Sequence, residues 1–423
     1  MNGRDLDVVV FGASGVTGRG VAAYLAERAP ETGLRWAAAA RDPAKLATVL
    51  EGLGVGAPET IRADVGAADS LAAMAARTRV VLDLVGPYTL YGRPVIEACI
   101  AAGTHYVDLT GELPFVREII ADFEGPAREA GVKIVQTAGF EALPPDLMVA
   151  RSDELARDRH GEGLASVDIE VKMFSPPGLP RPSDGVSGGT FQSVLALAAA
   201  DDAGAIEDPA ILITDPAVAA AVRRVSPIAL APRRGEGGAV LAPMAPAAFI
   251  NPGVIHRSAA LIAAAEGRAA APFRYREAIV LDGGPVTEPA RWGIAGLMAA
   301  SQLGARALAR SRPSVRGRVA GAMARLGPSS GFGPTGRRME EWRWRMTARG
   351  LTAAGNANTI TLDADGHPGY LATARLLGEA GILLSEDGAT PERYGCLTPA
   401  AALGTGCLDR FAKARLRFAG AYF

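Results

Sequence analysis

Cysteine and histidine are scarce in this sequence. Its 423 residues contain three cysteines, Cys99, Cys396 and Cys407, and four histidines, and no two cysteines form a C-x-x-C pair. This scarcity argues against a disulfide framework and against a zinc site, so we predict no bound metal. Widely spaced single cysteines fit a reducing compartment, and we therefore expect a cytoplasmic protein.

An excess of charge of either sign is also missing. Lysine and arginine number 44 and aspartate and glutamate 45, which leaves a net charge of −1. A chain without a basic excess has no whole-chain attraction to nucleic acid, so we predict no nucleic-acid partner. The first residues show no basic region followed by an apolar region, and we expect no secretory signal.

One stretch approaches a membrane helix in composition. Residues 292–309 are rich in alanine, leucine, glycine and methionine, but they are fewer than the roughly 20 residues of a spanning helix and include Arg306. We predict a buried or amphipathic helix here. The alternative is contact with a membrane surface, which would make the protein peripheral to a membrane.

The first 150 residues show a regular alternation of strands and helices. Short apolar runs alternate with helical segments, and the six predicted strands begin at Val8, Leu34, Thr60, Arg79, Thr104 and Val132. Alternation over this length predicts an α/β domain with a Rossmann-type, doubly wound parallel sheet, which we assign to residues 1–150.

The pattern changes after Asp146. Strands are predicted at 166–174, 273–281, 341–350 and 358–363, and they would form a mixed or antiparallel sheet. We assign residues 151–375 to an inserted α+β substrate domain and residues 376–423 to C-terminal helices that return to the Rossmann domain. A helix is predicted over residues 187–200, and no element is assigned to residues 201–272.

A glycine-rich turn follows the first predicted strand. Three glycines stand at three-residue spacing in residues 12–18, and a helical segment follows. Glycine lets a pyrophosphate approach backbone N–H groups closely, and the start of a helix carries partial positive charge. The turn therefore predicts dinucleotide binding, with a plain tight turn as the alternative. The candidate cofactor-binding residues are Gly12, Ser14, Gly15, Val16, Thr17 and Gly18.

Basic residues follow the second predicted strand, where a dinucleotide fold meets the adenosine ribose. Arg41 comes directly after the strand, and Lys45 lies one turn into a helix that begins with Asp42 as N-cap and Pro43. A cation suits the 2′-phosphate of NADP, whereas an acidic residue would bind the 2′-hydroxyl of NAD. We therefore predict NADP(H), the alternative for Arg41 being an ordinary solvated charge. Asp64, at the end of the third strand, is a further cofactor-binding candidate near the adenine.

Three polar side chains are candidates for proton transfer. Tyr88 follows Gly86 and Pro87 at the end of the fourth strand, and Glu112 and Glu141 follow the fifth and sixth strands. In a doubly wound sheet these strand ends face the crevice that holds the nicotinamide. We predict the tyrosine and the two glutamates as catalytic, and Gly86 and Pro87 as cofactor contacts. The alternatives are packing for the tyrosine and hydrogen bonding to N–H groups at a helix start for the glutamates.

Seven short segments are spread over nearly the whole chain. They are residues 12–18 (Gly-Ala-Ser-Gly-Val-Thr-Gly), 40–42 (Ala-Arg-Asp), 85–88 (Val-Gly-Pro-Tyr) with Tyr91 and Gly92, 105–112 (His-Tyr-Val-Asp-Leu-Thr-Gly-Glu), 139–141 (Gly-Phe-Glu) with Pro144 and Asp146, 187–190 (Ser-Gly-Gly-Thr) and 398–401 (Thr-Pro-Ala-Ala). In this order they resemble the saccharopine dehydrogenase-like oxidoreductase family and, within it, the bacterial trans-acting enoyl reductases.

The resemblance implies an NADP-type Rossmann domain, an inserted substrate domain with a mixed sheet and a C-terminal return. It also implies reduction of a carbon–carbon double bond in a polyketide or lipid chain, free or carrier-bound, with an acyl carrier or a polyketide synthase as a candidate partner. Two alternatives stay open: reduction of a C=N bond as in the saccharopine reductases, and a lipid- or membrane-associated NADP-binding protein without turnover. The oligomeric state is open, with a homodimer as one candidate.

Overall fold

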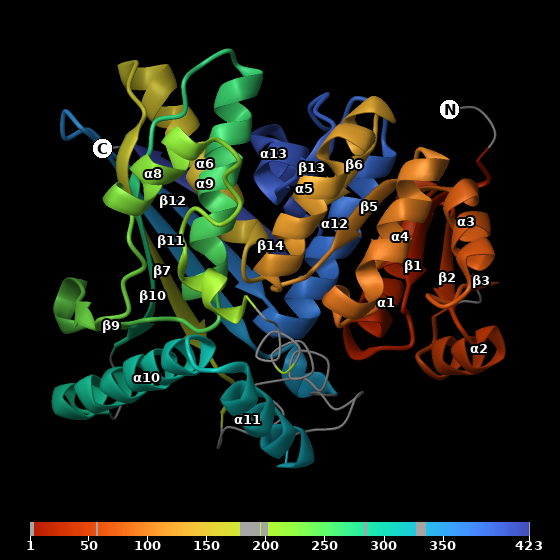
Figure 1. The fold of residues 1–423 in the computed structure, drawn as a ribbon, viewed down its shortest axis with the longest axis horizontal. Coiled ribbons are helices and arrows are strands. Elements are labelled where there is room, and N and C mark those ends of the chain that lie inside the picture. Colours follow the sequence, from red (N-terminus) through yellow and green to blue (C-terminus); the bar gives the residue numbers. More distant parts are fainter. Residues whose placement is uncertain are drawn as a thin grey trace.

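Two seven-stranded sheets organise the chain. The computed structural model describes residues 4–55, 58–177, 195, 202–282, 286–326 and 336–422. In Figure 1 strands β1 to β5 of the first sheet lie on the right in red and orange, and the second sheet lies on the left. The predicted α/β fold with a second, mixed sheet is confirmed. The helix predicted at 187–200 lies outside the described residues, apart from Leu195.

The first sheet is parallel throughout. Its order is β3-β2-β1-β4-β5-β6-β13, so the chain reverses direction across the sheet between β1 and β4, the kind of switch point at which doubly wound sheets bind ligands. The elements are β1 (Leu6–Phe11), α1 (Val16–Thr32), β2 (Trp36–Ala40), α2 (Pro43–Gly52), β3 (Glu59–Arg62), α3 (Ala68–Arg77), β4 (Thr78–Asp83), α4 (Tyr88–Ala102), β5 (His105–Asp108), α5 (Leu113–Glu129), β6 (Lys133–Val135), α6 (Leu143–His160) and β13 (Gly395–Leu397).

The core lies on both faces of this sheet. Alternate residues of β1 face opposite sides, so Val8 and Val10 belong to one buried cluster and Val9 and Phe11 to another. Burial on both faces explains why β1 is a continuous apolar run in the sequence. The predicted N-cap of α2 is also confirmed, because Oδ1 of Asp42 accepts a hydrogen bond from the N–H of Lys45 at 3.0 Å.

The second sheet is mixed. Its order is β14-β12-β11-β7-β10-β9-β8, in which β7 and β10 are parallel and all other neighbours are antiparallel. The elements are β7 (Leu164–Phe174), η2 (Ala203–Glu207), α8 (Pro216–Val225), β8 (Arg233–Arg234), η3 (Glu236–Gly238), β9 (Val240–Ala242), α9 (Ala247–Ala265), β10 (Arg274–Leu281), α10 (Glu288–Ala309), α11 (Pro313–Leu326), η4 (Arg337–Met339), β11 (Arg343–Thr352), β12 (Ala357–Asp365) and β14 (Leu416–Tyr422).

The C-terminal part of the chain joins both sheets. After η5 (Pro368–Ala372) come α12 (Thr373–Ser385), β13, α13 (Pro399–Leu403), η6 (Thr405–Ala412) and β14. We expected only helices that return to the Rossmann domain. Instead β13 pairs with β6 of the first sheet, and β14 pairs with β12 of the second. The tail therefore closes an edge of each sheet, because both strands lie at sheet edges.

Helix α12 anchors the C-terminal part of the chain to the Rossmann half. All its residues are buried, and it packs on α1 and β4 of the Rossmann half. The hydroxyl of Tyr24 on α1 donates to Oε2 of Glu379 at 2.6 Å, and the carboxylate also lies 3.4 Å from Arg28 and 3.3 Å from Arg410. A fully buried carboxylate is stable here because a hydroxyl and two cations surround it.

Candidate functional site

The turn after β1 requires two of its three glycines for packing. Gly12 has a φ of +88°, and a Cβ on it would lie 2.9 Å from Cγ2 of Val85. A Cβ on Gly18 would lie 2.3 Å from the carbonyl oxygen of Gly12, an atom that cannot move aside. These two positions therefore exclude other residues, whatever the turn binds.

Gly15 differs from the other two glycines. It is exposed, with a φ of −71° in the N-cap position of α1, and a Cβ on it would meet only the carbonyl oxygen of Gly12, at 3.4 Å. Contacts within the chain do not require glycine here, whereas the approach of a phosphate does. We therefore predict that a dinucleotide pyrophosphate lies against the open space beside Gly15, which we call the cradle.

The start of α1 supplies donors to this cradle. The N–H groups of Val16, Thr17 and Gly18 lack an intrahelical acceptor, as in the first turn of any helix. Gly15 has no side chain that could cap them. Ser14 and Thr17 are partly exposed beside them. Such a helix start attracts anions. The six candidate residues lie together in the turn after β1 and the first turn of α1.

The predicted adenosine side of the site is basic. Arg41 and Lys45 are exposed beyond the carboxyl end of β2, and in the described part of the chain neither side chain has an ion-pair partner. Arg62 is a third exposed cation on this side. It ends β3 and is the register partner of Ala40, the residue before Arg41. We did not single out Arg62 from the sequence, although a basic residue at the end of the neighbouring strand could have identified it.

Asp64 shapes its own turn. Its Oδ1 accepts a hydrogen bond from the N–H of Gly66 at 3.0 Å, and its N–H donates to Oγ of Ser70 at 3.0 Å. These bonds organise the link between β3 and α3. A contact between Asp64 and an adenine stays a prediction.

The turn after β4 adjoins the glycine turn at the switch point. Gly12 packs against Leu84 and Val85, and the next two residues, Gly86 and Pro87, are exposed and partly exposed. Pro87 is the N-cap residue of α4. The two predicted cofactor contacts thus lie at the edge where ligands bind in this fold class.

Tyr88 points into the protein. Its side chain is buried, and its hydroxyl donates to the backbone carbonyl of Asp83 at 3.0 Å. Burial, with the nearby acids Asp108 and Asp83, raises its pKa well above 10. These contacts favour the packing alternative that we considered for this residue, and they leave its predicted catalytic role without structural support.

Glu112 caps a helix. Its buried carboxylate accepts hydrogen bonds from the N–H of Tyr88 at 3.1 Å and the N–H of Thr89 at 2.8 Å, and from the hydroxyl of Thr89. A carboxylate is stabilised by the N–H groups and partial positive charge of a helix start. The helix is α4 rather than α5, which follows Glu112 in the sequence. Tyr88 and Thr89, which supply these donors, both lie at the start of α4.

Glu141 lies against a buried polar group of the second half. Its side chain is partly exposed, and burial raises its pKa. Asn251 on α9 donates from Nδ2 both to the backbone carbonyl of Glu141 at 2.7 Å and to Oε2 of Glu277 on β10 at 2.6 Å. Tyr275 donates to the same Oε2 at 2.7 Å. The loop after β6, α9 and β10 therefore meet here.

Glu277 and Asn251 each keep one acceptor atom without a partner among the described residues. These buried atoms are Oε1 of Glu277 and Oδ1 of Asn251. Burial, with Glu141 as a nearby like charge, raises the pKa of Glu277 to about 7. A carboxyl group that is buried beside a like charge ionises less readily. We did not predict Asn251 or Glu277, because residues 201–272 had no assigned element and β10 was interpreted only as a strand.

A second acid pair lies under the ends of β4 and β5. Asp83 and Asp108 are register partners and fully buried, and the Tyr106 hydroxyl lies 3.2 Å from Oδ2 of Asp83 and 3.0 Å from Oδ2 of Asp108. One hydroxyl donates a single proton, so the second contact requires a protonated carboxyl. Burial accordingly raises the pKa of Asp83 to about 8 and that of Asp108 to about 7. Acids that end two adjacent apolar runs are the sequence signal for this pair.

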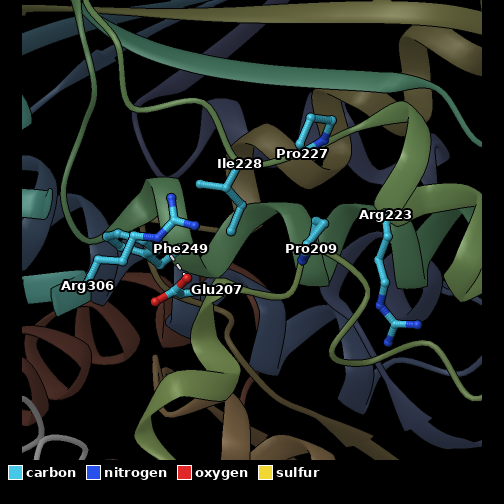
Figure 2. Close-up of a pocket in the computed structure, with 7 residues that line it drawn as sticks. All are labelled: Glu207, Pro209, Arg223, Pro227, Ile228, Phe249 and Arg306. Carbon is cyan, nitrogen blue, oxygen red and sulfur yellow. Dashed lines mark hydrogen bonds and ion pairs between the residues drawn. The ribbon is translucent and has the colours of Figure 1, made fainter. Parts of the chain in front are cut away.

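A cavity of about 130 Å³ lies elsewhere, near η2, α8, α9 and α10. Figure 2 shows Arg306 turned toward Glu207 across it, at 2.7 Å, with Phe249 and Ile228 nearby. Arg223 is paired with Asp208. This volume is below the 300 Å³ or so of a ligand pocket, and none of our predicted site residues lines it. We therefore place the candidate site at the sheet edge, not here.

Known proteins are similar in sequence to this chain, both over its first domain and over nearly its whole length. The family model for the saccharopine dehydrogenase NADP binding domain matches residues 8–135. A putative trans-acting enoyl reductase of Mycobacterium tuberculosis is 35% identical over 421 residues, which cover 96% of this chain and 95% of that protein. The trans-acting enoyl reductase of Mycobacterium ulcerans is 34% identical over 418 residues, covering 96% of each. The chain belongs to the trans-acting enoyl reductase family.

A solved structure extends the comparison to the whole fold. Apo saccharopine dehydrogenase (L-Glu forming) from Saccharomyces cerevisiae matches with a TM-score of 0.53 and 14% identity, covering 98% of this chain and 100% of that one. At this identity the match shows the fold alone. Both sheets and their connection therefore belong to the saccharopine dehydrogenase fold.

Family membership decides the cofactor and the enzyme class. The matched domain is an NADP-binding domain and contains the glycine turn, Arg41 and Lys45. The prediction of NADP(H) as cofactor is confirmed, and this member of the trans-acting enoyl reductase family is an NADP-dependent oxidoreductase. The roles of individual residues stay predictions.

Proposed function

We propose that the chain reduces the carbon–carbon double bond of an enoyl substrate with NADPH. The substrate is an acyl chain of polyketide or lipid type, free or bound to a carrier, and the partner is an acyl carrier or a polyketide synthase. The names of the relatives, enoyl reductases that act in trans, support this proposal. The mycobacterial sources of these relatives fit the expected bacterial origin.

The observation that carries the proposal is the charge of the wall around Glu141. This wall consists of Glu141, Glu277, Asn251 and Tyr275, and in the described part of the chain no cation perturbs the pKa of either glutamate. A substrate with several carboxylates, such as a diamino acid conjugate, needs cations to bind. An uncharged acyl thioester does not, so the acid wall favours the enoyl substrate over a saccharopine-type substrate.

The proposed chemistry assigns separate tasks to the cofactor and the chain. NADPH, when bound, supplies a hydride. The residues of the chain must hold the double bond in place and deliver a proton to the substrate α-carbon, where negative charge develops once the β-carbon has accepted the hydride. We propose Glu141 as the proton source, because burial raises the pKa of its carboxyl and so favours the protonated form that can donate.

An assay with purified full-length protein tests the function. NADPH oxidation is followed by its absorbance with an enoyl thioester, with the corresponding saturated thioester as control, and with imine-forming pairs of amine and carbonyl compounds. We expect turnover with the enoyl thioester alone. Turnover only with the imine-forming pairs would replace the proposal by C=N reduction. NADPH binding without turnover of any of them would instead support a protein that binds the cofactor without catalysis.

We also propose the domain limits and the setting of the protein. The limits are residues 1–150, 151–375 and 376–423, with β13 and β14 as the contributions of the last segment to the two sheets. No described helix is both long and apolar enough to cross a bilayer. We infer a cytoplasmic location, with residues 292–309 as a candidate for peripheral membrane contact. Size-exclusion chromatography with light scattering tests whether the chain forms a homodimer.

A further inference from the structure

Helix α10 carries large apolar side chains that are exposed on its outer face, and no described element covers them. Its inner face packs on β9 through Ala295, and Gln302 donates to the backbone carbonyl of Pro243 at 2.8 Å. On the outside, Leu297 is 74% exposed, Leu303 51% and Ile294 45%. No other helix in the described ranges carries three large hydrophobic side chains with this exposure.

The segment that contains this face has basic side chains and no acidic ones. From Pro289 to Met339 the sequence contains nine arginines and no aspartate or glutamate, although the whole chain has a net charge of −1. On α11 and just before it, Arg312, Arg318 and Arg325 are exposed. None of these three has an ion-pair partner among the residues that the structure covers. Isolated like charges of this kind attract anions.

The two helices lie together at one end of the molecule. Figure 1 shows α10 and α11 in teal at the lower edge, on the side of the second sheet and away from α2 and α3. Arg306 and Arg310 at the end of α10 bind Glu207, which fixes that end of the helix to η2. The apolar face and the unpaired arginines are thus presented by one anchored helix and its neighbour.

We propose that α10 and α11 form a surface that binds anionic membranes. The residues of this surface are Ile294, Leu297, Leu303, Arg312, Arg318 and Arg325. The aliphatic side chains enter the boundary between headgroups and acyl chains, and the arginines bind the phosphates of anionic lipids. The helix lies on the bilayer and does not cross it, in agreement with the finding on helix length and composition.

A lipid surface fits this combination better than an acidic protein does. Residues 292–305 carry no charge, which is a length of about 20 Å at 1.5 Å per residue. On the outer face of α10, the exposed residues between Ile294, Leu297 and Leu303 are small. Exposed aliphatic side chains near cations are typical of helices that lie in a membrane interface. The centres of protein–protein interfaces are instead rich in aromatic anchors such as tryptophan and tyrosine. The three most exposed large side chains of α10 are aliphatic.

Vesicle flotation with the full chain tests this surface. We expect binding to phosphatidylcholine vesicles that contain phosphatidylglycerol, and binding at least about tenfold weaker to phosphatidylcholine alone. The double variant Ile294→Ser, Leu297→Ser should lose binding to both vesicles. The triple variant R312Q, R318Q, R325Q should lose only the preference for the anionic lipid.

The control variant is Leu351→Ser, because Leu351 is an exposed leucine of β11, in the second sheet. It should bind vesicles as the unchanged protein does. Absence of binding to anionic vesicles, or equal binding to both vesicle types, overturns the proposal. Saturable binding of an acidic acyl carrier protein that the triple variant abolishes, without vesicle binding, would also overturn it and assign the surface to a protein partner. Circular dichroism confirms that each variant is folded.

Discussion

The two halves of the candidate site are built in opposite ways. The half beside β1 and β2 depends on absent side chains at residues 12–18 and on exposed cations at 41 and 45, all within a short stretch of chain. The half beside β5 and β6 depends on polar groups whose partners come from other elements, since Asn251 of α9 donates both to the backbone carbonyl of Glu141 and to the carboxylate of Glu277. The first half is therefore a local product of the sequence, and the second is a product of tertiary folding.

The largest expected effect is a difference in stability between variants of two glycines. Packing within the chain requires glycine at position 18, whereas the space beside Gly15 is open. Gly18→Ala puts a Cβ 2.3 Å from a backbone oxygen, so we expect a loss of at least about 3 kcal/mol of unfolding free energy or no folded protein. Gly15→Ala meets only an ordinary contact, so its stability should stay within about 1 kcal/mol of the parent.

Urea unfolding and NADPH titration distinguish the two variants. We expect Gly15→Ala to bind NADPH at least about tenfold more weakly, because a methyl group then occupies the cradle, a cost of about 1.4 kcal/mol. A Gly15→Ala protein with unchanged NADPH affinity would show that the pyrophosphate lies elsewhere. A stable Gly18→Ala protein would contradict the packing argument.

The next effect compares the two glutamates of the other half. Glu141→Gln removes the proposed proton source, so kcat should fall about 100-fold or more while the protein stays folded. Glu112→Gln replaces one carboxylate oxygen by an NH2 group that faces the N–H donors of α4. That variant should lose about 1–3 kcal/mol of stability but keep most of its kcat.

Steady-state kinetics and thermal unfolding of both variants form the test. The assignment fails if Glu112→Gln loses kcat at unchanged stability while Glu141→Gln stays active, because the catalytic and structural roles would then be exchanged. Glu141→Asp is a further control, since a carboxyl group at a shorter reach should restore part of the lost kcat.

A smaller effect tests the basic edge near β2. Arg41→Ala should raise the KM for NADPH about tenfold and leave the KM for NADH nearly unchanged, because only NADPH carries the 2′-phosphate. The matched control is Arg35→Ala. Arg35 precedes the other end of β2, where its guanidinium pairs with Asp7 at 2.7 Å, so the ratio of the two KM values should not change. An equal loss with both cofactors would contradict the assignment of Arg41.

How much of the site could be predicted follows from the same comparison. The glycine turn, the Asp42 cap and the cations after β2 were visible because their spacing is local and the fold class fixes their position. The capping role of Glu112 was visible only in part. Its donors at Tyr88 and Thr89 lie 24 and 23 residues away, and the strand order brings them together.

Little of the half of the site beside β5 and β6 could be predicted from the sequence. Asn251 belongs to α9, which is buried on nearly all sides, so the helix shows no amphipathic period, and Pro252 next to it indicates a turn rather than a helix. β13 has three residues, too short for a period-two pattern. Buried helices and very short strands are recognised by what they pack against, which a single sequence does not state.

The smallest expected effect is on the pH dependence of stability. It tests whether the buried acids under β4 and β5 share a proton. The pKa values of Asp83 and Asp108 are raised in the folded chain, to about 8 and about 7, above the usual value near 4. Between these limits the folded chain binds more protons than the unfolded chain. The contribution of these acids is therefore fully present below about pH 4 and is lost as the pH rises through about 7 to 8.

Asp83→Asn should flatten this dependence, because an amide takes up no proton while it keeps the shape of the side chain. Urea unfolding at several pH values between about 5 and 8 measures the slope, to which one proton contributes at most about 1.4 kcal/mol per pH unit. Asp5→Asn is the control, since Arg77 holds the pKa of Asp5 below its usual range, and its titration lies outside this window. An unchanged slope in Asp83→Asn would mean that Asp83 stays ionised at neutral pH. The proton that the two contacts of the Tyr106 hydroxyl require would then lie on Asp108, whose pKa is also raised, rather than on Asp83.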